Sequence, residues 1–217
     1  HLKSNANNET QIELQTAPRW PNRKSESQAN DASACLMMGE KYRVSGKLDE
    51  ALIWFKKALA LKPDCAEAYF KIGGIESGRG QVKTAESCYR QALQCDPRLA
   101  EAWNNLGLIR KSRQDFSGAS RCLERAIEID PDFSEAHFNL GNLHFLQRRM
   151  DQAESCFSRV LAIKPDSSGA QIALGDLRQK QGRLEEALDH YSEALKLEPA
   201  SAELFNNIGN IYKLQKR

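Results

Sequence analysis

Cysteine is the residue type in this chain best suited to bind a metal ion or to form cross-links, and six cysteines are present. Three of them, Cys88, Cys122 and Cys156, follow one another at a spacing of 34 residues, which predicts the same place in consecutive structural repeats. Neighbouring helices pack about 8 to 10 Å apart, whereas a disulfide requires Cα atoms within about 7 Å of each other. We therefore expect packing cysteines, with no metal site and no cofactor. Free thiols in this number favour a reducing compartment, namely the cytoplasm or the nucleus.

Histidines and carboxylates, the next candidates for chemistry, follow the same repeat. His137 and His144 occupy core positions that suit aromatic residues, and His190 shares the position of the three cysteines. A glutamate recurs in the first turn of the predicted helices, where the helix dipole favours negative charge; these residues are Glu67, Glu101, Glu135 and Glu203. The sequence contains no nucleophile with a neighbouring base and no glycine-rich phosphate loop. We expect no enzymatic activity from this chain.

The cysteines, histidines and glutamates are positioned by a sequence repeat, and the recurrence of proline shows its period. Five prolines recur every 34 residues: Pro63, Pro97, Pro131, Pro165 and Pro199. A fixed period of this length predicts stacked units, each of which depends on its neighbours for a core. Within a unit, apolar residues at i, i+3, i+4 and i+7 predict one amphipathic helix, and a second apolar stripe follows after a turn. Each unit is therefore expected to hold a first and a second helix.

Glycine and alanine recur within each unit and predict how the two helices meet. Gly46, Gly80 and Gly182 fall between the first and second helices, where a left-handed residue ends a helix at low cost. A glycine on the first helix and an alanine on the second predict close backbone approach; the pairs are Gly39/Ala51, Gly73/Ala85, Gly107/Ala119, Gly141/Ala153 and Gly175/Ala187. Aspartates after the prolines and two serines are predicted to cap the following helices; they are Asp64, Asp132, Asp166, Ser134 and Ser168.

The complete motif is clearest in the third unit, which carries Trp103, Leu106, Gly107, Ala119, Leu123, Ala126 and Pro131. This pattern resembles the tetratricopeptide repeat (TPR) family. The resemblance implies an all-α fold, a right-handed superhelical solenoid of helix-turn-helix units over residues 32–217. The expected domains are five complete repeats, at 32–65, 66–99, 100–133, 134–167 and 168–201, followed by the first helix of a sixth repeat at 202–217. Residues 1–31 are rich in polar residues and are expected to form a largely disordered extension.

The resemblance also implies a concave groove, lined by positions 2, 5, 6, 9 and 12 of each unit, that receives a peptide. Asparagine or aspartate recurs at these positions: Asn104, Asn105, Asn139, Asn142, Asp176, Asn206, Asn207 and Asn210. Each asparagine side chain both donates and accepts, so a ladder of them would pair with the main chain of an extended peptide. The ladder is similar to that in the repeats of O-GlcNAc transferases. The alternative is that asparagine is merely tolerated on a polar face.

Apolar residues accompany the asparagines in the expected groove: Phe70, Phe138 and Ile172 at one position, with Leu108 and Phe145 nearby. Exposed in the groove, they would anchor apolar side chains of a partner. Alternatively, they bridge adjacent first helices as part of the core.

Charge and hydropathy restrict the remaining partner classes. The net charge is +2, which gives no concentrated basic surface for nucleic acid. No stretch approaches the roughly 20 apolar residues that membrane insertion requires.

Both ends of the chain offer surfaces for self-association. Phe205, Ile208 and Tyr212 should face a second helix, so we expect either that the protein continues beyond Arg217 or that two chains cover each other's ends. The N-terminal extension is a further candidate for docking in a groove.

These observations predict a non-catalytic scaffold that binds a peptide segment of a partner protein in the concave groove. The alternative is that the repeats form the substrate-targeting arm of a longer, O-GlcNAc-transferase-like enzyme. A third alternative is a structural spacer without a ligand.

Overall fold

The computed structural model describes residues 32–215, and within this range the regular secondary structure is entirely α-helical. The predicted N-terminal extension at 1–31 lies outside the described residues. The chain divides into two compact units, one ending at Pro63 and the other beginning at Asp64. Together with the structural similarities reported below, the paired helices confirm the predicted all-α solenoid.

The described part of unit 1 is a single helix pair. Helix α3 (Ala32–Val44) packs against α4 (Leu48–Leu61). Cys35 of α3 and Phe55 of α4 are fully buried, as are Ala51 and Ala58. A Cβ atom added to Gly39 of α3 would lie 2.5 Å from the Phe55 ring, so the repeat glycine of this pair packs against the aromatic residue of the second helix.

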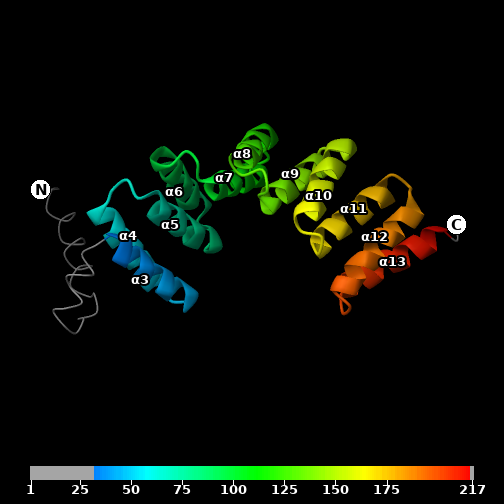
Figure 1. The fold of residues 1–217 in the computed structure, drawn as a ribbon, viewed down its shortest axis with the longest axis horizontal. Helices are drawn as coiled ribbons and strands as arrows, with labels where there is room; N and C mark the ends of the chain where they lie inside the picture. Colours follow the sequence, from blue (N-terminus) through cyan, green and yellow to red (C-terminus); the bar gives the residue numbers. More distant parts are fainter. Residues whose placement is uncertain (1–31, 216–217) are drawn as a thin grey trace, which may run out of the picture. The chain divides into compact units, whose positions relative to one another are not determined.

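Unit 2 contains four helix pairs and one further helix within the described residues. The helices are α5 (Ala66–Gly78), α6 (Val82–Cys95), α7 (Ala100–Ser112), α8 (Phe116–Ile129), α9 (Ser134–Leu146), α10 (Met150–Ile163), α11 (Ser168–Lys180), α12 (Leu184–Leu197) and α13 (Ala202–Gln215). Each odd-numbered first helix packs against the second helix that follows it, and each second helix packs against the next first helix. Figure 1 shows this succession from α5 to α13.

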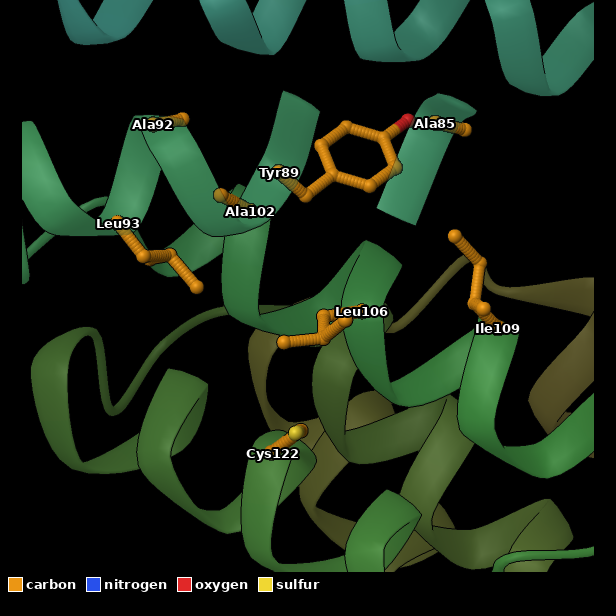
Figure 2. Close-up of a cluster of buried hydrophobic side chains, with 8 residues drawn as sticks. All are labelled: Ala85, Tyr89, Ala92, Leu93, Ala102, Leu106, Ile109 and Cys122. Carbon is orange, nitrogen blue, oxygen red and sulfur yellow. The ribbon is translucent and has the colours of Figure 1, made fainter. Parts of the chain in front are cut away.

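The core of unit 2 is divided among successive helix pairs. One cluster joins α6, α7 and α8 through Tyr89, Leu93, Leu106, Ile109 and Cys122 together with small alanines, and Figure 2 shows these side chains. Each cluster draws residues from consecutive repeats, so neighbouring helix pairs share a core.

The repeat glycines of the first helices lie against large side chains of the second helices. A Cβ atom added to Gly141 would lie 2.6 Å from the ring of Phe157, and one added to Gly175 would lie 2.5 Å from the ring of Tyr191. Contacts this short do not occur between real atoms, so the large residue of the second helix requires the glycine. The paired alanines are fully buried nearby, and at Gly107 the backbone carbonyl of the paired Ala119 lies 3.4 Å from the added Cβ atom.

The predicted left-handed glycines are confirmed. Gly46, Gly80 and Gly182 have φ values of 74°, 74° and 77°. The third and fourth repeats have no glycine at this place, yet Gln114 and Arg148 adopt φ values of 61° and 60° there. The turn closes in the same way after α3, α5, α7, α9 and α11 because the same backbone hydrogen bonds recur; the Asp115 amide donates to the Arg110 carbonyl over 3.0 Å, for example.

The prediction of helix caps was wrong for all five named residues; the cap position of α5, for example, is Cys65 and not Asp64. Ser134 and Ser168 are the first residues of α9 and α11, preceded by Phe133 and Ser167 at the cap positions. The hydroxyl of Ser167 accepts a hydrogen bond from the Ala170 amide over 3.3 Å, whereas Phe133 has no side chain that accepts. The sequence did not show which of the adjacent residues Ser167 and Ser168 caps α11, because the cap position depends on the local backbone angles.

Candidate functional site

All thirteen predicted groove residues lie on the first helices of unit 2. Phe70 belongs to α5; Asn104, Asn105 and Leu108 to α7; Phe138, Asn139, Asn142 and Phe145 to α9; Ile172 and Asp176 to α11; and Asn206, Asn207 and Asn210 to α13. Helix α9 contacts both α7 and α11 directly. The three central first helices, α7, α9 and α11, therefore present their candidate residues side by side. We call all thirteen residues together the first-helix face.

This face contains a hollow of about 410 Å³ between α5, α6 and α7, referred to below as the α5–α7 hollow. It is lined by Gly74, Ser77, Val82, Tyr89, Asn105, Leu108, Ile109 and Ser112. Two of these residues, Asn105 and Leu108, were predicted from the sequence. A Cβ atom added to Gly74 would meet nothing within 4 Å, so the absence of a side chain at this position helps to keep the hollow open.

Tyr89 joins the hollow to the core. Its ring packs against Phe70 with 5.9 Å between the ring centroids. Burial raises the pKa of the Tyr89 phenol, and hydrogen bonds with Asn105 and Ser77 act in the opposite direction. The phenol therefore stays neutral at physiological pH and offers a polar group beside Asn105. The sequence did not identify Tyr89 as a site residue because the same position holds Phe55 and Leu123 in other repeats.

The central asparagines bond to one another across two first helices. Asn139 Nδ2 donates to Asn104 Oδ1 over 2.9 Å. Asn104 Nδ2 in turn lies 3.2 Å from Glu135 Oε1 and 3.3 Å from Asn105 Oδ1. Asn104 is only 1% exposed, so its side chain serves the contact between α7 and α9. Asn105 and Asn142 are half-buried and retain surface.

Asp176 on α11 is held by a tyrosine from the paired second helix. The Tyr191 hydroxyl lies 2.7 Å from Asp176 Oδ1 and 3.1 Å from Gln179 Oε1. Burial and this bond to Asp176 raise the pKa of Tyr191, so the phenol remains a donor. Tyr191 occupies the same repeat position as Tyr89, and both hydroxyls meet polar residues of the first-helix face.

Most of the apolar candidates lie half-buried beside core clusters. Phe138 packs against Phe157 with ring centroids 5.7 Å apart, and Phe145 packs against the same cluster. Ile172 packs against the cluster of α12 and α13, and Phe70 against that of Figure 2. These four residues bridge neighbouring repeats, whereas Leu108 lines the hollow.

The last helix carries the most exposed candidates. Asn206 and Asn210 are exposed and Asn207 is half-buried. Helix α13 buries Leu204 and Ile211 completely, whereas Phe205 is 56% exposed and Tyr212 is 54% exposed.

The cysteines occupy the predicted packing positions. None of the six forms a disulfide bond; Cys122 is buried, and Cys88 and Cys156 are half-buried. Burial raises the pKa of Cys122, and it raises that of Cys156 to about 11. These thiols are therefore protonated at physiological pH and behave as small apolar side chains.

The histidines also pack within the repeat. His137 Nε2 lies 2.9 Å from the Pro131 carbonyl, which matches the bond of 3.0 Å between Trp103 Nε1 and the Pro97 carbonyl one repeat earlier. His190 Nδ1 lies 2.8 Å from Gln171 Oε1. His144 is 7% exposed, and burial followed by the charge of Arg149 lowers its pKa.

The described residues contain no group of three metal-binding side chains. Over the same part of the chain, every helix is too short or too polar to span a bilayer.

Two family profiles together match nearly the whole sequence. The profile of the Cilia and flagella-associated protein 70 C-terminal domain matches residues 2–165, and a TPR repeat profile matches residues 175–216. No curated protein matches the sequence.

Solved structures share the fold. MamA is 26% identical, with a TM-score of 0.66 over 75% of this chain and 95% of MamA. YrrB, described as a TPR protein with an unusual peptide-binding site, is 23% identical with a TM-score of 0.66, over 83% of this chain and 93% of YrrB. PilF of Pseudomonas aeruginosa is 22% identical with a TM-score of 0.78, over 88% of this chain and 86% of PilF.

The first profile alone covers well over half of the chain. The protein therefore belongs to the family of the Cilia and flagella-associated protein 70 C-terminal domain, and its helix pairs are tetratricopeptide repeats.

Proposed function

We propose that this protein is a non-catalytic interaction scaffold that binds an extended segment of a partner protein along the first-helix face of unit 2. The TPR family and the similarity to MamA support protein interaction in general. The α5–α7 hollow carries the more specific proposal because it places Asn105 beside an open space of about 410 Å³. This space is large enough for one bulky side chain of a bound segment.

The lining of the hollow defines the side chain that it would accept. Val82, Leu108 and Ile109 provide apolar contact, and Ser77, Ser112 and Tyr89 provide hydroxyl groups. None of the lining residues is charged, so a charged side chain would lose its hydration without gaining an opposite charge. An uncharged apolar or aromatic side chain therefore fits best. The half-buried Asn105 side chain, which already bonds to Asn104, would offer its remaining hydrogen-bonding capacity to the main chain of the segment.

The family description associates this domain with cilia and flagella. A partner protein from that compartment is accordingly the first class to test. The alternative is that the repeats are the targeting arm of a longer enzyme and that the asparagine ladder binds its substrates. This alternative stays a prediction, because no specific contact in the structure favours it.

The test is to fill the hollow without disturbing the fold. Gly74→Leu places a side chain where the structure leaves space, so the variant should fold normally while captured partners fall by about tenfold or more. Gly78→Leu is the matched control: it lies on the same helix, it also has nothing within 4 Å of the added Cβ, and it does not line the hollow.

Affinity capture from an extract of ciliated cells, with quantitative mass spectrometry, would compare the wild type and the two variants. Partners lost with Gly74→Leu but kept with Gly78→Leu support the proposal. Equal partner sets for Gly74→Leu and the wild type would exclude the hollow as the binding site. Circular dichroism of each variant verifies that the helices are intact.

A further inference from the structure

A second hollow, of about 300 Å³, lies between α8 and the turn that joins α9 to α10. Its polar lining consists of Ser117, Ser120, Arg121 and Glu124 of α8, and of Gln147 and Arg149 of the turn. None of these residues belongs to the first-helix face or lines the α5–α7 hollow. We call this cavity the α8–α10 hollow, and it is a separate surface of the molecule.

The next repeat has an ion pair at the equivalent place. Arg178 of α11 donates to the two carboxylate oxygens of Glu154, over 2.7 and 2.5 Å, and to Gln181 Oε1 over 3.0 Å. The residues 34 positions earlier are His144, Ser120 and Gln147. At the α8–α10 hollow the arginine and the carboxylate are therefore both replaced, whereas the glutamine is the same.

The preceding repeat also has a carboxylate at the position of Ser120. Glu86 of α6 accepts from Arg90 over 2.7 Å and forms an ion pair with Arg113. Helices α6 and α10 thus each supply a glutamate that pairs with an arginine of the following repeat, and α8 supplies Ser120 instead. The α8–α10 hollow lies where this glutamate is missing.

Polar groups around the hollow lack partners among the described residues. Gln147 Oε1 is buried and accepts no hydrogen bond, although Gln181 Oε1 accepts one at the equivalent place. Arg121 and Arg149 are exposed, and neither guanidinium forms an ion pair or a hydrogen bond within the part of the chain that the structure describes. Two guanidinium groups at the hollow are therefore available to a ligand.

Arg149 shows most directly that an acidic group is missing. Its equivalent in the next repeat, Arg183, pairs with Glu186 over 2.6 Å. The residue equivalent to Glu186 is Gln152, so Arg149 has the guanidinium of this pair without the carboxylate. Arg121 adds a second guanidinium at a position where the next repeat has a serine.

The charges of the lining favour an anion. Arg121 and Arg149 outnumber Glu124, and the Ser120 hydroxyl donates to Glu124 Oε1 over 2.7 Å, so this carboxylate already has a partner. A further carboxylate in the hollow would accept charge-assisted hydrogen bonds from the two guanidinium groups. A volume of about 300 Å³ is sufficient for one aspartate or glutamate side chain.

We propose that the α8–α10 hollow binds an acidic side chain of a partner protein, with Arg121 and Arg149 holding its carboxylate. The partner thus supplies the acidic group that Glu86 and Glu154 supply within the chain in the neighbouring repeats. This site does not depend on the peptide-binding role of the first-helix face. It also differs in preference, because the α5–α7 hollow has no charged residue in its lining.

Fluorescence anisotropy with a labelled oligoglutamate peptide tests this site in the 217-residue chain. The wild type should bind the peptide, more weakly as salt is added, and should not bind an oligoglutamine peptide of the same length. Arg121→Gln and Arg149→Gln should each weaken binding by about tenfold or more. Ser120→Glu should weaken it as much, because this substitution places the glutamate of the neighbouring repeats in the hollow.

Arg125→Gln is the matched control for all three variants. It changes the net charge by the same amount on the same helix, but Arg125 lies outside the hollow and pairs with Glu128 over 2.7 Å. This variant should leave the affinity nearly unchanged, and so should Gly74→Leu, which separates this site from the first-helix face. Circular dichroism verifies that each variant is folded.

Two outcomes would overturn the proposal. One is a wild type that does not bind oligoglutamate at low salt. The other is an equal loss of affinity with Arg125→Gln and with the variants of the hollow, which would assign the binding to overall charge.

Discussion

Individual glycines and aromatic residues set the contacts within each repeat. The glycine of a first helix is needed because the large side chain sixteen positions later lies directly on it, as Tyr89 does on Gly73. A side chain at that glycine would displace the ring and separate the helices. The periodic glycine thus reports a contact with a large side chain that the sequence pattern alone did not identify.

His144 should make the stability of the protein dependent on pH. Burial lowers its pKa, Arg149 lowers it further, and Glu124 acts in the opposite direction. As the pH falls below about 6.5, the unfolded chain binds a proton that the folded chain resists, so the free energy of unfolding decreases. Urea unfolding at pH 7 and pH 5 should show this loss, and the loss should be smaller in His144→Leu. An equal loss in both proteins would assign the pH dependence to other groups.

The turns between the first and second helices of the repeats share one backbone geometry, although their sequences differ. Glycine occupies the left-handed position in three repeats, but Gln114 and Arg148 adopt the same conformation in the other two. Backbone hydrogen bonds fix this turn, and the neighbouring helix pairs hold its ends in place. A residue with a Cβ atom is therefore tolerated there, although the conformation costs energy.

Arg148→Gly should stabilise the turn between α9 and α10. The substitution removes the strain of a left-handed residue with a side chain, and the greater freedom of glycine in the unfolded chain offsets part of the gain. The net effect should be an increase of about 0.5 to 1 kcal/mol in the free energy of unfolding. Thermal and urea unfolding would measure it, with Arg149→Gly as a neighbouring control. A lower stability of Arg148→Gly would show that the arginine side chain makes a compensating contact.

At the scale of the molecule, unit 2 is a stack in which each helix pair contacts its neighbours. The buried clusters of Figure 2 and of the later repeats each involve consecutive helices. The asparagine bonds between α7 and α9 add a polar link of the same short range. Local damage should therefore spread to adjacent pairs before it reaches distant ones.

Gly141→Leu tests this behaviour. Its Cβ would lie 2.6 Å from the Phe157 ring, and overpacking of this kind costs about 1 to 3 kcal/mol. Hydrogen exchange followed by mass spectrometry should show the greatest loss of protection in α9 and α10, a smaller loss in α8 and α11, and the least in α5 and α6. A uniform loss across unit 2 would indicate that the whole unit unfolds cooperatively as one body.

The sequence alone determined the helix pairs and their stacking, because a 34-residue period and apolar spacing of 3.6 residues act through local structure and contacts between neighbouring repeats. It also placed the candidate residues on the first helices. The tertiary structure decided which of them remain accessible. Asn104 is buried and accepts a hydrogen bond from Asn139, and Phe138 packs against a core cluster. Asn105 and Leu108, in contrast, line an open hollow. Accessibility depends on side chains from adjacent repeats, such as Tyr89 and Gly74, and a periodic pattern carries no information about how those side chains meet.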